Sequence, residues 1–427
     1  MKFERSIVKL QTALNYTPVG AQTYSKSYRY FEKDFGPFFM QRGHGSTLID
    51  IDGNRFTDYI CSLGAITLGY NFKPVNQAIK KQLKKGIIFS TQSELEIELA
   101  ERLIHYLPGA EFVRFLKNGS DATSTAIRLA RAYTGKDVIL MSGYHGMDDW
   151  SIGTTSNNNG IPKETLRLTD TFKYNDIDDI KAQLEKHANH VAAIILEPIQ
   201  GNGPYDGYLE ELKELAHKNG ALLIFDEVVS GFRYALGGAA EYYHVTPDLA
   251  AYGKGMANGM PISAVVGPKY LLKGIEDDVF VSTTFGGETL SLAAAIATID
   301  FMIKNNTQEK LGILGTYFQD FLIKSVDELD LSKFVTLYGL PHRNGIMFKD
   351  YGDYQALELQ TFYQREMLKH GILTLNISNF MHAHSKASID KLTNITNRVL
   401  IDLKEFIRTN QHINSDSLIN PIFQRNK

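Results

Sequence analysis

The stretch ALLIFDEVVSGFR, residues 221–233, decides the fold of this chain, because an apolar run ends there in two adjacent carboxylates. A short, unbroken apolar run predicts a strand that is buried on both faces of a sheet. Burying charge is costly, so Asp226 and Glu227 at the end of such a strand require an explanation. A second stretch, AYGKGMANGMP at residues 251–261, soon follows and places Lys254 between two glycines.

Similar apolar runs alternate with segments of helical spacing from about residue 112 to residue 267. The expected strands are VRFLKN, DVILMSG, VAAIILEP, ALLIFDE and ISAVVG. Two helical segments between them, DATSTAIRLARAYTG and LEELKELAHKNG, end at Gly135 and Gly220, as helices often do. The alternation predicts an α/β domain in which helices flank a mostly parallel sheet.

Both chain ends have a different pattern from this central region. STLIDIDGNRFTDYI predicts a β-meander that turns at Asp52–Gly53, and a new mixture of helices and strands begins after residue 310. We therefore expect a large domain over residues 61–309, and a smaller α+β domain built from residues 1–60 and 310–427.

The composition excludes several classes of protein. The formal net charge of this 427-residue chain is −3, with both signs dispersed, so no basic stripe for nucleic acid or membrane is expected. Cys61 is the only cysteine, which excludes an intrachain disulfide and a multi-thiolate metal site. MKFERSIVKL lacks the apolar run of a signal peptide, and LSLAAAIATIDFMI is too short and polar to span a bilayer. We expect a cytoplasmic protein with a small-molecule partner and no metal.

The candidate site residues lie at strand ends, where ligands gather in open α/β sheets. Glu197 closes one apolar run and Asp226 closes another, although either could be a loop cap or an ion-pair partner. Lys254 could be a surface-turn lysine, or its accessible amine could form a Schiff base with an aldehyde cofactor. A P-loop does not fit, because Asp248 and Gly255 stand where it needs glycine and Ser or Thr.

Gly119 and Ser120 stand at the turn between a predicted strand and a long predicted helix. Free N–H groups and the helix dipole favour a phosphate at such a position. Ser120 could also be the N-cap of the helix, and the two roles are compatible.

Several short motifs follow one another over nearly the whole chain: GSTLIDIDGNRFTDYICSLG, NGSDATSTAIRLARAYTG, GYHG, LEPIQGN, FDEVVSGFR, GKGMANGMPISAVVG, TTFGGETLSLAAA and HGIL. In this order they resemble the class III, fold-type I aminotransferases that depend on pyridoxal 5'-phosphate (PLP). The branch is similar to glutamate-1-semialdehyde 2,1-aminomutase. The resemblance implies the PLP-dependent transferase fold type I.

The resemblance also implies the roles of the central residues. Lys254 would form the Schiff base (aldimine) with PLP, and Asp226 would pair with the protonated pyridine nitrogen, which withdraws electrons during catalysis. Gly119 and Ser120 would hold the cofactor phosphate.

Four further residues would surround the cofactor ring. Tyr144 of GYHG would stack on one face and Val228 would pack on the other. His145 flanks the tyrosine, and Glu197 resembles a family glutamate near the mouth of the active site; a structural role is equally open for both.

The resemblance further implies a homodimer with its active sites at the subunit interface. Thr284 of the TF-G motif would reach the phosphate held by the neighbouring subunit, with Thr283 as the alternative. Arg233 is interpreted as an ion-pair partner and not as a catalytic residue.

The sequence departs from the aminomutase pattern at the substrate contacts. QTYSK, with Thr23 and Lys26, replaces an NSPVR motif that grips the substrate carboxylate, and lysine cannot make the two-point grip of arginine. Asn376 replaces a glutamate, and Leu63 a tryptophan. We therefore expect a ping-pong aminotransferase that uses an amino-acid donor and a small carbonyl compound, such as a sugar- or polyol-type aldehyde or ketone. A glutamate-1-semialdehyde aminomutase and a non-catalytic PLP-binding protein are the alternatives.

Overall fold

The computed structural model describes residues 1–420, so the end of the expected domain 310–427 lies outside the described residues. Backbone contacts divide the chain into two compact units. The first consists of Met1–Phe72 and the chain from Glu309 onward, and the second is Lys73–Gln308. The contacts thus start the second unit at Lys73, whereas the sequence analysis set this boundary after residue 60.

The second unit contains a seven-stranded sheet in the order β4-β10-β9-β8-β7-β5-β6. Strands β9, β8, β7, β5 and β6 pair in parallel, and β10 is antiparallel to both β4 and β9. The strands are β4 Phe112–Leu116, β5 Val138–Ser142, β6 Thr169–Thr171, β7 Val191–Leu196, β8 Leu222–Glu227, β9 Leu249–Tyr252 and β10 Ser263–Gly267. The prediction of a mostly parallel sheet is confirmed.

The burial of the strands follows their place in the sheet. Every residue of β5, β7, β8, β9 and β10 is buried, as their unbroken apolar runs predict. The same prediction is wrong for β4, where only Leu116 is fully buried, because β4 forms one edge of the sheet.

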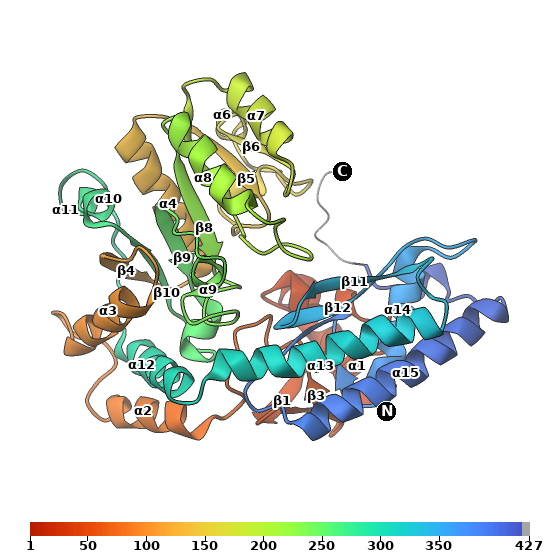
Figure 1. Cartoon of the computed structure of the whole chain (residues 1–427). Coiled ribbons are helices and arrows are strands. Elements are labelled where there is room, and N and C mark those ends of the chain that lie inside the picture. The colour runs from red at the N-terminus through yellow and green to blue at the C-terminus, as the bar shows by residue number, and fades with distance from the viewer. Residues whose placement is uncertain (421–427) are drawn as a thin grey trace. The chain divides into compact units, whose positions relative to one another are not determined.

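Helices flank this sheet, and Figure 1 shows α4 and α8 beside its strands. Helix α4 ends at Thr134 and is followed by Gly135 with φ 65°, as predicted, and α8 ends two residues before Gly220. The helices of this unit are α2 Lys73–Leu83, α3 Glu94–Tyr106, α4 Gly119–Thr134, α5 Asp149–Ile152, α6 Lys163–Leu166, α7 Ile177–Lys186, α8 Tyr208–Lys218, α9 Gly238–Tyr242, η4 Lys254–Ala257, α10 Lys269–Leu272, α11 Gly274–Asp277 and α12 Thr289–Lys304.

The first unit joins the two ends of the chain in one sheet. The predicted meander is present as β1 Met40–His44, β2 Thr47–Asp50 and β3 Arg55–Asp58, and β13 Ile372–Leu373 pairs with β3 in parallel. A second, antiparallel sheet contains β11 Val335–Leu340, β12 Arg343–Phe348 and β14 Ile377–Asn379.

Four long helices and several short ones complete the first unit. They are α1 Glu4–Leu14, η1 Pro18–Gly20, η2 Tyr24–Lys26, η3 Tyr28–Tyr30, α13 Thr307–Glu328, which begins at the boundary, α14 Ala356–Lys369, α15 Lys386–Arg408 and η5 Ser415–Ser417. Apolar side chains of α13, α14 and α15, among them Phe318, Leu359 and Leu400, form one buried cluster. Within residues 1–420, the helices lack the length and apolar character that crossing a membrane requires.

Candidate functional site

The two carboxylates that end β8 serve opposite faces of the strand, as successive strand residues do. Asp226 is only 4% exposed, and its Oδ2 lies 2.8 Å from Nδ1 of His145. Its Oδ1 accepts a hydrogen bond of 3.0 Å from the backbone N–H of Val228. These two contacts fix the carboxylate of Asp226 at the end of the strand.

Glu227, for which sequence reasoning gave no role, holds the start of α9. Its carboxylate accepts hydrogen bonds from the N–H groups of Ala239 and Ala240, at 2.9 and 2.7 Å, and from the hydroxyl of Ser230. Burial raises the pKa of Glu227 to about 7. Of the two carboxylates that end β8, Asp226 is therefore a candidate site residue and Glu227 is a structural residue.

Lys254 lies at the same edge of the sheet as Asp226. Strands β8 and β9 are parallel, with Asp226 opposite Ala251, so both strands deliver their carboxyl ends to one side. Lys254 begins η4 just after β9, is half-buried, and has φ 32°, which is unusual for a residue with a side chain. Such backbone strain is concentrated at functional sites.

The start of α4 also belongs to this edge. Strand β4 runs parallel to β9, because both are antiparallel to β10, and the turn after β4 contains Gly119 and Ser120. The N-cap is Asn118, so the interpretation of Ser120 as the N-cap is wrong. Gly119 and Ser120 are the first two helical residues, and N–H groups there have no acceptor within a helix.

Glycines in this region permit close backbone approach. A Cβ atom on Gly119 would lie 2.8 Å from Cγ1 of Val228, and one on Gly146 would lie 2.5 Å from Oγ of Ser120. A Cβ on Gly253 would lie 3.6 Å from the same Val228 methyl. Val228 thus lies between the start of α4 and the turn that presents Lys254.

The turn after β5 contributes Tyr144 and His145. His145 is buried behind Asp226, whereas Tyr144 is 45% exposed, and partial burial, Asp148 and Asp226 all raise its pKa. Glu197 follows β7, and its Oε1 lies 3.2 Å from the position of a Cβ on Gly143.

Gln200 was missed as a residue of this edge, although it stands in the quoted motif LEPIQGN. Its Nε2 donates to the carbonyl of Ser142 at 2.8 Å. This bond joins the loop after β7 to the end of β5, and nothing in the local sequence pattern indicates it.

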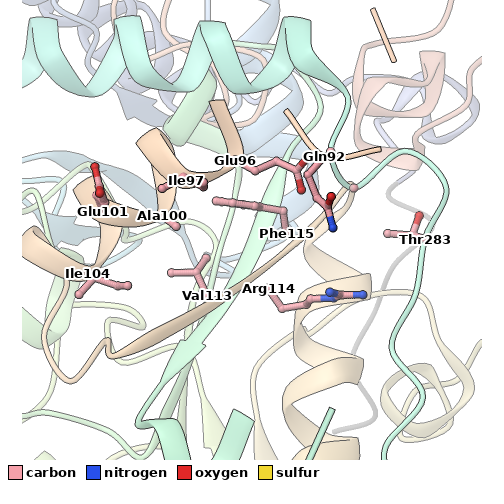
Figure 2. A pocket seen from close by; sticks show the side chains of 12 residues that line it. Gln92, Glu96, Ile97, Ala100, Glu101, Ile104, Val113, Arg114, Phe115 and Thr283 are labelled. Carbon is pink, nitrogen blue, oxygen red and sulfur yellow. The ribbon is translucent and has the colours of Figure 1, made fainter. Parts of the chain in front are cut away.

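Thr284 lies in an exposed loop, next to the equally exposed Thr283. The loop begins near Val281, whose carbonyl accepts a 2.5 Å hydrogen bond from the guanidinium of Arg114. Thr283 and Arg114 lie at one end of a pocket of ≈ 630 Å³, with Glu101 and Ile104 at the other (Figure 2). Of the residues predicted to contact the cofactor, only Thr283, the alternative to Thr284, lines this pocket.

The three predicted substrate contacts are in the first unit. Thr23 and Lys26 are exposed in and next to the short helix η2, and Nζ of Lys26 donates to Oγ of Ser62 at 3.1 Å. Asn376 is buried at 3% exposure, and within residues 1–420 its Oδ1 has no hydrogen-bond donor.

The residues at the sheet edge fit PLP by their chemistry. A buried carboxylate, a lysine on a strained turn and a helix start with no Cβ at its first residue are the groups that its ring nitrogen, aldehyde and phosphate need. In the described part of the chain, no cluster of three His, Cys, Asp or Glu residues could hold a metal ion.

Comparison with known proteins gives close relatives. A profile of the family described as Aminotransferase class-III matches residues 30–376. The 3-aminobutyryl-CoA aminotransferase of Cloacimonas acidaminovorans is 36% identical over 381 residues, which cover 87% of this chain and 90% of that protein. The glutamate-1-semialdehyde 2,1-aminomutase of Archaeoglobus fulgidus is 39% identical over 331 residues, covering 74% and 78%.

Solved structures show the same fold. The FumI protein of Sphingopyxis sp. MTA144, solved with PLP, has a TM-score of 0.87 and 26% identity, covering 95% of this chain and 98% of that one. An omega-transaminase from Sphaerobacter thermophilus has a TM-score of 0.84 and 23% identity over 93% and 97% of the two chains. The resemblance seen in the motifs is thereby confirmed, and this chain belongs to the class-III aminotransferases, PLP-dependent enzymes of fold type I.

Proposed function

We propose that this enzyme moves an amino group from an amino-acid donor to a small carbonyl compound in two half-reactions of a ping-pong cycle, with Lys254 and Asp226 as its catalytic residues. The observation that carries the proposal is the convergence of Lys254, Asp226, Tyr144 and the start of α4 at one edge of the parallel sheet. Ligands of open α/β sheets bind at this edge.

Each residue of the edge has a separate task in holding the cofactor. The N–H groups of Gly119 and Ser120 bind the phosphate at the positive end of α4. Tyr144 and Val228 cover the two faces of the ring, and the carboxylate of Asp226 keeps the ring nitrogen protonated. PLP, when bound, supplies an electron sink for the carbanion formed at the substrate Cα.

Lys254 has two tasks in turn. Its Nζ would hold the cofactor aldehyde as a Schiff base, and as a free amine Nζ would take the proton from the substrate Cα and deliver it across the imine nitrogen, a 1,3-proton shift. One positioned residue can do both, because its turn keeps the amine beside the reacting carbon. Glu197 and His145 line the same region, and His145 orients Asp226.

The acceptor is a less anionic carbonyl compound than glutamate 1-semialdehyde, of sugar, polyol or related type. Thr23, Lys26 and Asn376 form the substrate contacts, and a lysine in place of arginine weakens a two-point grip on a carboxylate. The relatives' names span intermolecular transfer and the intramolecular 2,1 shift, so an aminomutase is the second candidate.

The active unit is a cytoplasmic homodimer in which Thr284 of each copy reaches the phosphate bound by the other. Phe280, which is 80% exposed, and Phe285 flank the threonines, and exposed aromatic side chains of this kind favour a contact with a partner chain.

Half-reaction assays test this function. Adding amine donors one at a time to the PLP-loaded enzyme should change the visible absorption of the cofactor and release one equivalent of carbonyl product, and a carbonyl acceptor should then restore the spectrum. Lys254→Ala should lower turnover by at least a thousandfold, whereas Lys218→Ala on the exposed end of α8 should not change it. Efficient conversion of glutamate 1-semialdehyde without any donor would instead establish the aminomutase.

A further inference from the structure

The imidazole of His145 is held between two hydrogen-bond acceptors. Nδ1 lies 2.8 Å from Oδ2 of Asp226, and Nε2 lies 3.1 Å from the carbonyl oxygen of Ser142. A carbonyl and an ionised carboxylate can only accept, so both ring nitrogens must carry a proton for both bonds to form. This arrangement exists for one orientation of the ring, and rotation would break both bonds at once.

Trp150 lies against this imidazole and is the only tryptophan in the chain. The two rings are stacked, with centroids 6.2 Å apart and planes 7° apart, and Trp150 is 8% exposed. The indole therefore flanks the imidazole in an offset parallel arrangement, at a separation at which aromatic rings attract one another.

A chain of hydrogen bonds holds the indole in turn. Its Nε1–H donates to Oγ of Ser124 at 2.8 Å, and the Ser124 hydroxyl donates to the carboxylate of Asp148. Thr123, the preceding residue of α4, donates to the backbone carbonyl of His145 at 2.6 Å. Two neighbouring residues of α4 thus position the indole of Trp150 and the backbone of His145.

We propose that Trp150, held by Ser124 and Asp148, is a positioning residue that keeps the His145 ring against Asp226 and thereby fixes the carboxylate that the proposed function assigns to the cofactor's ring nitrogen. Asp226 accepts from His145 on one oxygen and from Val228 N–H on the other, so its orientation depends on both donors. Loss of the indole face frees the imidazole, and the carboxylate then loses one of its two fixed partners.

Two substitutions distinguish the effect of the Trp150 ring from the effect of its hydrogen bond to Ser124. Trp150→Leu removes the ring, whereas Trp150→Phe keeps a ring but loses the N–H donor to Ser124. Phe318→Leu is the matched control, because it removes a buried aromatic ring from the first unit, with no contact to His145. For each variant, equilibrium dialysis gives the Kd for PLP, and a pH titration gives the midpoint of the change in visible absorption of the bound cofactor.

Trp150→Leu should raise the Kd for PLP at least tenfold and move the pH midpoint, while Trp150→Phe should stay within about threefold of the wild type and Phe318→Leu should match it. A wild-type Kd and midpoint in Trp150→Leu would overturn the proposal, as would an equal effect of Phe318→Leu. Should Trp150→Leu not fold, Trp150→Met, which keeps most of the side-chain volume but has no ring, decides: a shifted midpoint supports the proposal and an unchanged one overturns it. An enzyme that binds PLP yet transfers no amino group would refute the proposed function alone.

Discussion

Glu227 and Asp226 are neighbours in sequence but differ in chemistry, because β8 turns them to opposite faces. A carboxyl group whose pKa is raised on folding contributes stability below its unfolded pKa, and this is lost as pH rises through the folded value. For Glu227, with a folded pKa of about 7 against an ordinary 4.5, the loss between pH 4.5 and 7 is about 3 kcal/mol. Glu227→Gln should remove this component.

The measurement is the thermal midpoint of wild type and Glu227→Gln from pH 5 to pH 8. The variant should melt lower, because glutamine presents an N–H₂ group to one of the two donors, Ala239 or Ala240, which costs about 1–3 kcal/mol. The difference in thermal midpoint between the two proteins should narrow as pH rises. A constant difference would contradict the raised pKa of Glu227. Ser230→Ala, which keeps the carboxylate and removes one of its donors, is the control and should keep the pH trend.

The position of a single residue was predictable where that residue ended a strand. The positions of Asp226 and Glu197 were predictable because an unbroken apolar run predicts a buried strand, and the residue at its carboxyl end then lies at the edge of a parallel sheet. Trp150 and Gln200 were missed because their partners, His145 and Ser142, are set by tertiary packing that leaves no mark in the local spacing. The N-cap role left open for Ser120 beside a phosphate contact is wrong, because Asn118 occupies that position.

At the scale of elements, the loop that contains Thr283 and Thr284 depends on two arginines of its own chain. Arg114 of β4 donates to the carbonyl of Val281, and Arg128 of α4 donates to that of Phe280 at 2.7 Å. Arg114→Gln should therefore release the loop, and amide hydrogen exchange over residues 279–286 should rise several-fold. The control is Arg102→Gln, which breaks an exposed ion pair with Asp300 of α12. Equal exchange in both variants would show that Arg114 does not hold the loop.

Two strands of the seven-stranded sheet were missed because they are short, and the direction of a third was not predicted. Strand β6 is only three residues long and polar, and β9 merges with the glycine-rich turn before Lys254, so neither shows the long apolar run of its neighbours. Strand β10 has such a run, but its antiparallel direction comes from its connections, because periodicity shows burial and not direction.

At the scale of the molecule, the first unit depends on both chain ends, which meet where β13 pairs with β3. The sequence predicted this union from two segments that differ from the central βα pattern, but not the packing that joins them. His384 lies at that junction: it accepts from Met381 N–H at Nδ1, donates from Nε2 to the carbonyl of Asp58, and stacks on Tyr59 at 4.4 Å. Both nitrogens are satisfied only in the neutral ring.

Acid should therefore destabilise the first unit before the second. Burial lowers the pKa of His384 to about 3 and that of His382 to about 4, with Lys310 adding to both, so their stabilising effect is lost as pH falls below 6.5. Burial raises the pKa of Asp58 to about 6, so protonation of this carboxyl group stabilises the fold as pH falls, but over a narrower pH range than the range affected by His384. Between pH 6 and 4, the amide protection factors over residues 372–389, which correct for the intrinsic exchange rate, should fall while the emission of Trp150, in the second unit, stays constant. His384→Gln should weaken this trend, and simultaneous loss of both signals in the wild type would mean that acid unfolds the two units as one.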